Sequence, residues 1–167
     1  MKHRYISTLT AVAVAGLISA GGSLPASVFL KQDISSLKKS AEAVVHAKVV
    51  EVGSYWNADH TLIFTDVRLE VLGRLHGDAD SQMVVRVPGG TVDDFTVEME
   101  GAPRFNLDEE VVAFIARWKD GVPMVAGYFQ GLSRVERDQL GNPFLRGGVA
   151  DGMPISDLAR QLRQTGR

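Results

Sequence analysis

Histidines and carboxylates are the residues of this chain that could do chemistry, because its 167 residues include no cysteine. His46, His60 and His76 lie beyond the N-terminal region, and no two of them stand four residues apart. A zinc site on one helix needs such a pair, as in the His-Glu-x-x-His pattern of metallopeptidases. We therefore expect these histidines at the surface or in turns, and we predict no metal site, no cofactor and no catalytic residue.

The carboxylates form short clusters that the sequence places at turns. His76-Gly-Asp-Ala-Asp80 alternates oxygen-bearing side chains, but an EF-hand calcium loop needs about twelve residues and a distal glutamate. Two other acidic clusters are Asp93–Asp94 and Asp108–Glu110. If the fold brought two such carboxylates together, they could serve as the acid and base of a glycoside hydrolase. A hydrolase of this kind is the alternative function that the sequence leaves open.

Motifs for nucleophilic catalysis and phosphate binding are incomplete. Gly131-Leu-Ser-Arg-Val135 lacks the second glycine of a Gly-x-Ser-x-Gly elbow. Gly89–Gly90 is followed by neither Gly-Lys-Ser/Thr nor a helical pattern, so we interpret it as a turn. The arginines are scattered and the formal net charge is −2, which argues against a nucleic-acid partner.

Two adjacent aromatic residues, Tyr55 and Trp56, could support binding. They fall in a predicted polar link, residues 54–60, between two strands. An exposed tryptophan there would contact a sugar or a protein. The alternative is that Trp56 folds over the end of a barrel as a plug.

The elements that must position these residues are mainly strands. Residues 61–72 alternate with period two, placing Val67 and Leu69 on one face and Arg68 and Glu70 on the other. Residues 111–118 are apolar nearly throughout, which predicts a central strand covered on both faces and ending in a core Trp118. Further strands are predicted over 43–52, with a bulge near Val49–Val50, and over 82–87, 95–100, 122–129, 132–137 and 144–146.

Many short strands and few helices predict a mainly β fold. We expect a small closed or partly open barrel of the oligonucleotide/oligosaccharide-binding (OB) or netrin-like kind, and consider a lipocalin-like barrel second. A short helix capped by Asp33 should precede the strands, and an amphipathic helix carrying Leu158 and Leu162 should follow them. The domain prediction is a signal peptide over 1–26 and one β-barrel domain over 27–167.

The N-terminus is typical of a secretory signal peptide. Lys2 and Arg4 precede the uncharged apolar run Ile6–Ala20, and small residues suit cleavage after Ala20 or Ala26. A membrane anchor is the alternative, but a spanning helix needs about 20 apolar residues. We therefore predict an exported protein, periplasmic or extracellular, with no stable membrane insertion after cleavage.

Several short segments stand in a particular order: residues 41–49, 54–56, 64–65, 67–72, 87–90, 101–105 and 108–114. This order resembles a group of small exported bacterial proteins with a β-barrel core, over about residues 37–136. It is also distantly similar to the netrin-like barrel of tissue inhibitors of metalloproteinases. The inhibitors place an N-terminal cysteine on the catalytic zinc, and because this chain has no cysteine, no inhibitory residue carries over.

These observations predict an exported binding or accessory domain of the cell envelope without enzymatic activity. Its partner would be an exported protein, and the netrin-like resemblance implies a protease. Contacts are expected from three loops at one end of the barrel, 55–60, 88–94 and 101–105. The candidate contact residues are Tyr55, Trp56, His60, Gly89, Gly90, Asp93, Asp94, Arg104 and Phe105.

Overall fold

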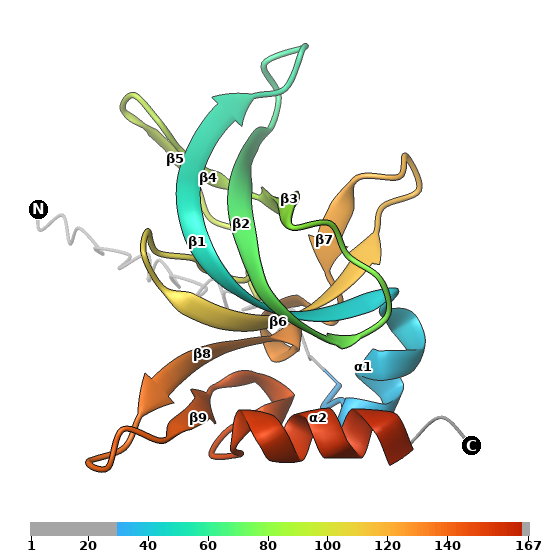
Figure 1. Ribbon diagram of the computed structural model, residues 1–167. Helices are drawn as coiled ribbons and strands as arrows, with labels where there is room; N and C mark the ends of the chain where they lie inside the picture. Colours follow the sequence, from blue (N-terminus) through green and yellow to red (C-terminus); the bar gives the residue numbers. More distant parts are fainter. Residues whose placement is uncertain (1–29, 165–167) are drawn as a thin grey trace, which may run out of the picture.

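Alternating apolar and polar residues form the antiparallel strands that dominate the fold, as expected. The computed structural model describes residues 30–164, so the predicted signal peptide lies outside the described residues. Helix α1 and helix α2 stand near the two ends of this range (Figure 1). The elements are α1 (Ile34–Ser40), β1 (Ala43–Trp56), β2 (Ile63–His76), β3 (Gln82–Pro88), β4 (Gly90–Val92), β5 (Phe95–Val97), β6 (Glu110–Arg117), β7 (Pro123–Val125), the 3-10 helix η1 (Tyr128–Gly131), β8 (Leu132–Arg137), β9 (Pro143–Arg146), the 3-10 helix η2 (Gly148–Ala150) and α2 (Ile155–Gln164).

We expected a closed or partly open barrel; the main sheet is open, and no closed barrel is found among residues 30–164. Its strands run in the order β3-β2-β1-β6-β8-β9, with β7 paired to β6, and β4 and β5 form a separate two-stranded sheet. The main sheet curls until β3 and β7 touch, but no ladder joins them (Figure 1). β7 has only three residues and begins at Pro123, which has no N–H to donate. Few backbone groups of β7 are therefore available to pair with β3 and close the sheet.

Two apolar clusters lie on the two faces of the main sheet. Val111, Ala113 and Ile115 of β6 belong to the cluster inside the curl. Val112 and Phe114 belong to the cluster on the other face, which α1 and α2 cover. The prediction that β6 is a central strand buried on both faces is therefore confirmed.

The β1–β2 hairpin is the longest feature of the fold and is bent by a bulge. A register shift between Val49 and Glu51 confirms the bulge predicted near Val49–Val50, and such a shift bends a strand. Both strands are longer than predicted, so residues 54–56 belong to β1 and not to a link. The turn is shorter because the Asn57 side chain accepts hydrogen bonds from the Thr61 and Leu62 backbone N–H groups, at 2.8 and 2.9 Å.

The α1 and α2 predictions are confirmed. The Asp33 carboxylate accepts a hydrogen bond from the Ser36 N–H at 2.7 Å, as an N-cap residue does. In α2, Leu158 and Leu162 are buried against the sheet.

Two details near β7 differ from the prediction. The strand expected over 122–129 is confined to Pro123–Val125, because Gly127 takes a left-handed conformation (φ +67°) that starts η1. The sequence predicts Trp118 in the core, but this residue is 39% exposed because the chain has already left β6 for the next turn.

Candidate functional site

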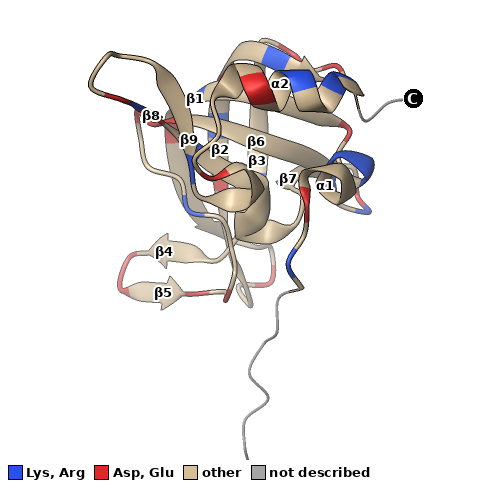
Figure 2. Ribbon diagram, turned by 90° about the horizontal axis from the view of Figure 1, so that it is seen from below, with Lys and Arg blue, Asp and Glu red and all other residues tan. Residues whose placement is uncertain are grey.

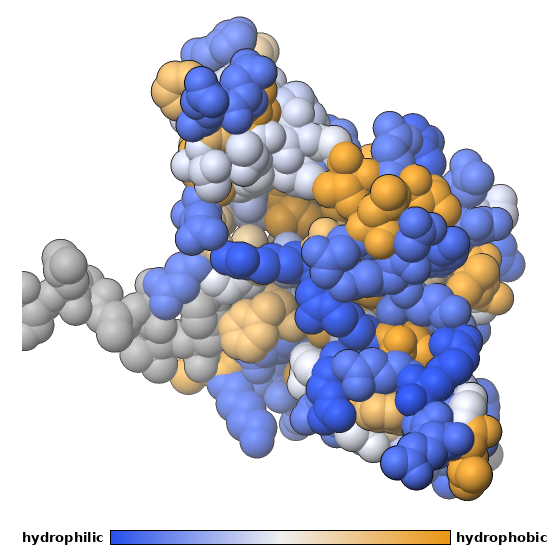
Figure 3. Space-filling model, turned by 90° about the vertical axis from the view of Figure 1, so that its left-hand side faces the viewer, coloured by the Kyte–Doolittle hydropathy of each residue, from blue (hydrophilic) through white to orange (hydrophobic). Residues whose placement is uncertain are grey.

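A cavity of about 370 Å³ opens at one end of the curl, where β1, β2 and β3 meet the β4–β5 hairpin. Its floor is apolar, with Val67 and Val87 at the edge of the inner core. On the face shown in Figure 3, the surface is hollowed beneath the projection at its top, and hydrophobic residues are visible in the hollow. The remaining lining comes from Val52, Ser54 and Thr65 and from residues 88–91, 96–99 and 102–106.

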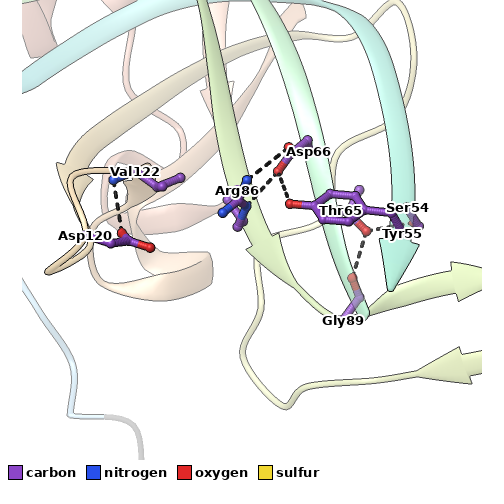
Figure 4. A network of polar contacts seen from close by, with 8 residues as sticks. All are labelled: Ser54, Tyr55, Thr65, Asp66, Arg86, Gly89, Asp120 and Val122. Atoms are coloured by element: carbon purple, nitrogen blue, oxygen red, sulfur yellow. Dashed lines mark hydrogen bonds and ion pairs between the residues drawn. The ribbon is translucent and has the colours of Figure 1, made fainter. Parts of the chain in front are cut away.

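A chain of hydroxyl groups forms one wall of this cavity. The Thr65 hydroxyl donates to the Gly89 carbonyl at 2.7 Å, and the oxygens of Ser54 and Thr65 lie 2.8 Å apart (Figure 4). Because Thr65 has a single hydroxyl proton, Ser54 must be the donor in the second bond. The lone pairs of the Ser54 oxygen therefore stay available to a ligand that carries an N–H or O–H group.

The Gly89–Gly90 pair makes this wall possible. Both glycines have positive φ angles, +92° and +136°, which residues with a Cβ rarely adopt. A Cβ on Gly90 would collide with the hydroxyl groups of Ser54 and Thr65. The turn expected at Gly89–Gly90 is thus also where the backbone comes close to the cavity wall.

The cavity rim carries one ion pair among the residues that line it. Arg104 Nη2 lies 3.0 Å from Glu98 Oε1, and both side chains are more than two-thirds exposed. Phe105 packs against the inner core from the same segment as Arg104. Each charge therefore meets its opposite at the rim, and the site favours an uncharged group in the cavity.

Tyr55 lies on the opposite face of the sheet from Ser54, because successive side chains of a strand alternate. Its hydroxyl donates to Asp66 at 3.2 Å, and Arg86 Nε binds the same carboxylate oxygen at 2.9 Å (Figure 4). Arg86 also lies over the rings of Tyr55 and Phe64, 5.6 and 5.8 Å from their centres. Burial raises the pKa of Tyr55, and the bond to Asp66 raises the pKa of Arg86. Both oxygens of the Asp66 carboxylate accept hydrogen bonds, so we interpret the group as a stabilising one.

Trp56 joins the tips of two hairpins. Its ring stacks on His60 of its own hairpin, with centroids 6.0 Å apart, and meets the edge of Phe95 from the β4–β5 hairpin at 5.8 Å. Trp56 is partly buried by these contacts, whereas Phe95 is 63% exposed. Trp56 therefore lies between two hairpin tips, in an aromatic group whose Phe95 is exposed.

His46 and the acidic cluster Asp108–Glu110 form ordinary surface contacts. Glu110 pairs with His46 at 3.2 Å and with Arg137 at 3.2 Å, and Asp108 pairs with Lys48 at 2.9 Å. Within residues 30–164, no group of three histidines or carboxylates is arranged to hold a metal ion.

A second cavity, of about 500 Å³, lies beside the first and shares residues 102–104 with it. Arg134 and Arg146 line it, but each is paired, with Glu109 at 2.9 Å and with Glu136 at 3.5 Å. Glu100 is the single carboxylate among its lining residues. The cavity therefore combines paired charges with glycine backbone and contains no two facing acids.

The predicted contact residues separate into three places. Gly89, Gly90, Arg104 and Phe105 line the first cavity, and Tyr55 belongs to the opposite face. Trp56 and His60 lie in the aromatic group at the hairpin tips, and Asp93 and Asp94 form the turn beside it.

The sequence did not identify Ser54, Thr65, Phe95 or the Arg86–Asp66 pair as parts of a site. Thr65 could have been identified, because it is the one polar residue on an otherwise apolar strand face. Ile63, Val67, Leu69 and Val71 form the rest of that face.

Comparison with protein-family models, with curated proteins and with solved structures found no match. The resemblance to netrin-like barrels therefore stays a prediction.

Proposed function

We propose that this protein is an exported, non-enzymatic binding domain of the cell envelope. It contacts a protein partner, such as an exported protease, through the loops at the open end of the sheet. Export rests on the N-terminal sequence, since residues 1–29 lie outside the described range. Within residues 30–164, none of the helices has both the length and the apolar character that crossing a membrane requires.

The observation that carries this proposal is the first cavity. It combines two of the three predicted contact loops in one concave wall, with an apolar floor and a hydroxyl-lined side. Pockets that bind partners or ligands combine these same features, an apolar lining with a few fixed polar groups. An apolar side chain of a partner would fill the floor while its backbone N–H donates to Ser54.

A binding role also fits the chemistry of the lining better than a hydrolase does. Two-carboxylate hydrolysis needs a pair of acids that face each other across the substrate. Glu98 is the single carboxylate among the residues that line the first cavity, and Arg104 holds it.

The fold proposal is a partly open barrel of the OB or netrin-like kind. The contact between β3 and β7 supports it, because this is where one further ladder would close the curl. In such barrels the binding surface lies on the strands and loops around the mouth, where the cavity lies here.

Site-directed crosslinking tests the function. A photoreactive amino acid at Thr96, which is exposed and lines the cavity, should capture one envelope protein in the producing cell. The same amino acid at Leu140, 86% exposed on the β8–β9 turn, is the matched control and should capture none. Adding Ser54→Ala, which removes the acceptor offered to the partner, should reduce the capture from Thr96. Crosslinking at both positions alike, or at neither, would contradict the proposal.

A further inference from the structure

We propose that the hairpin tips bind a basic segment of the protein partner, one that presents lysine or arginine beside an apolar side chain. This inference rests on the proposed function and adds the chemistry of the partner. The surface concerned, called the tip surface below, consists of Trp56, His60 and Phe95 with the adjoining carboxylates Asp59, Asp93 and Asp94.

The apolar part of the tip surface is exposed. Phe95 is 63% exposed although this residue opens β5, and its ring is held in place by the edge contact with Trp56. Trp56 is in turn held by His60. A fixed, exposed aromatic ring costs little entropy to bury, which is why such rings dominate binding energy at protein interfaces.

The carboxylates of the tip surface have no cationic partner among residues 30–164, in contrast to those of the sheet. Ion pairs engage most acids on β1, β2, β6 and β8, such as Glu51 with Arg68 and Glu110 with Arg137. Within the same range, Asp59, Asp93 and Asp94 take part in none of the ion pairs. Figure 2 shows the acidic turn between β4 and β5 at the end of a hairpin that stands apart from the main sheet.

Charge complementarity selects the partner. Carboxylates beside exposed aromatic rings attract a lysine or arginine in two ways, by an ion pair with the carboxylate and by a cation–π contact with the ring face. The same charges repel phosphate groups, so the tip surface disfavours nucleic acid and anionic lipid. A basic protein segment is the occupant that satisfies both the charge and the apolar area.

A peptide-binding measurement tests the inference on the mature chain. The probe is a fluorescent heptapeptide that alternates lysine with leucine and phenylalanine, and its counterpart carries glutamate in place of lysine. We expect the lysine probe to bind and the glutamate probe to bind at least about tenfold more weakly. Added salt should weaken binding of the lysine probe, because exposed charges are screened.

Matched variants locate the binding. The double change Asp93→Asn with Asp94→Asn should weaken the lysine probe at least about fivefold, and Phe95→Ala about tenfold. Asparagine suits the left-handed conformation of Asp93 (φ +51°), so the turn is retained. The controls are Asp78→Asn with Asp80→Asn, which remove the same charge from the β2–β3 turn, and Leu140→Ala. The controls should change affinity less than about twofold.

Three outcomes would overturn the inference. One is equal losses in the tip and control variants, and another is equal binding of the two probes. The third is self-association of the protein that the tip variants abolish, because the surface would then belong to a second copy. The proposed function is judged separately, by the crosslink from Thr96. If the tip variants still crosslink the partner as the parent chain does, the inference fails and the binding function stands.

Discussion

At the residue scale, the hydroxyl pair of Ser54 and Thr65 is the most informative feature of the site. Both side chains point into the curl among valines, where an unpaired hydroxyl would be costly. Their mutual bond and the bond to the Gly89 carbonyl remove that cost and fix the position of the turn.

Replacing Thr65 with valine should test this role. Valine keeps the shape but removes the donor to Gly89 and the acceptor for Ser54, so we expect a loss of about 1–2 kcal/mol in the free energy of unfolding. Urea unfolding measures the change. Thr91→Val is the control, because Thr91 is exposed and its hydroxyl pairs with Thr96 on the same hairpin, and it should change stability by less than about 0.5 kcal/mol. Equal losses would contradict the assignment.

Glu110 should make stability depend on pH. Partial burial acts to raise the pKa of Glu110, but hydrogen bonds from His46 and Arg137 outweigh burial and hold the pKa below its ordinary value of 4.5. A carboxyl with a lowered folded pKa contributes stability above its unfolded pKa, and loses it as the pH falls through the folded pKa. The stability difference between the parent chain and Glu110→Gln should therefore shrink as the pH is lowered below 4.5. Urea midpoints of the two chains across that range measure the change, and a difference that stays constant or grows would contradict this prediction.

At the scale of elements, the β2 register decides which residues reach the cavity. Val67 and Thr65 share the inner face, whereas Asp66 and Arg68 lie on the outer one. A slip by one residue would exchange the two faces and remove the hydroxyl wall. Pairing with β1 on one side and β3 on the other holds this register.

Paired substitutions in β2 test the register. Val67→Asp places a carboxylate in the inner core, where Val67 is 1% exposed, and should cost more than about 3 kcal/mol or prevent folding. Arg68→Asp removes an exposed pair with Glu51 and should cost about 1 kcal/mol or less. Urea midpoints compare the two variants. A larger loss at Arg68 than at Val67 would show that the faces are assigned wrongly.

The strands were predictable where a single local rule applied. Period-two alternation identified β2, β3 and the inner face of β1, and a run of apolar residues identified β6 as central. The lengths of β1 and β7 were not predictable from the pattern of residue types. Side-chain hydrogen bonds of Asn57 shorten the turn after β1, so β1 extends further. The left-handed dihedral angles of Gly127 end the segment that contains β7. The candidate site was predictable only in part. Its loops could be found from short stretches of sequence, but the Trp56–Phe95 contact joins two different hairpins and depends on how they pack.

At the scale of the whole molecule, charge is distributed unevenly. The hairpin tips carry acids without cationic partners in the described range, whereas α1 and α2 present basic residues at the other end (Figure 2). Lys38 and Lys39 lie in the last turn of α1, and Arg163 lies in the last turn of α2. We expect such a distribution to orient the proposed basic partner toward the tips and to increase its rate of association at low salt.

Metal removal should leave the fold unchanged. Paired and scattered histidines and carboxylates supply no closed set of ligands within residues 30–164, so we expect no metal to be coupled to folding. Thermal unfolding curves with and without EDTA should overlay, and elemental analysis should find no stoichiometric zinc or calcium. A lower melting temperature in EDTA would contradict this and return His46, His60 and His76 to consideration as ligands.

Export should remove the N-terminal segment without loss of stability. Sequencing of the protein from the producing cell should begin between about residues 21 and 27, as the small residues of the predicted signal peptide indicate. Cleavage there leaves the first contacts of the described chain intact. In these contacts the Gln130 side chain accepts a hydrogen bond from the Gln32 N–H at 2.8 Å and donates one to the Leu30 carbonyl at 3.0 Å. A chain that starts at Ser27 should therefore unfold at the same temperature as the protein recovered from the producing cell. A chain that starts at Asp33 should unfold at a lower temperature because both bonds are lost. An intact Met1 in the membrane fraction would contradict export with cleavage, and equal melting temperatures for the two truncated chains would contradict the role of Gln130.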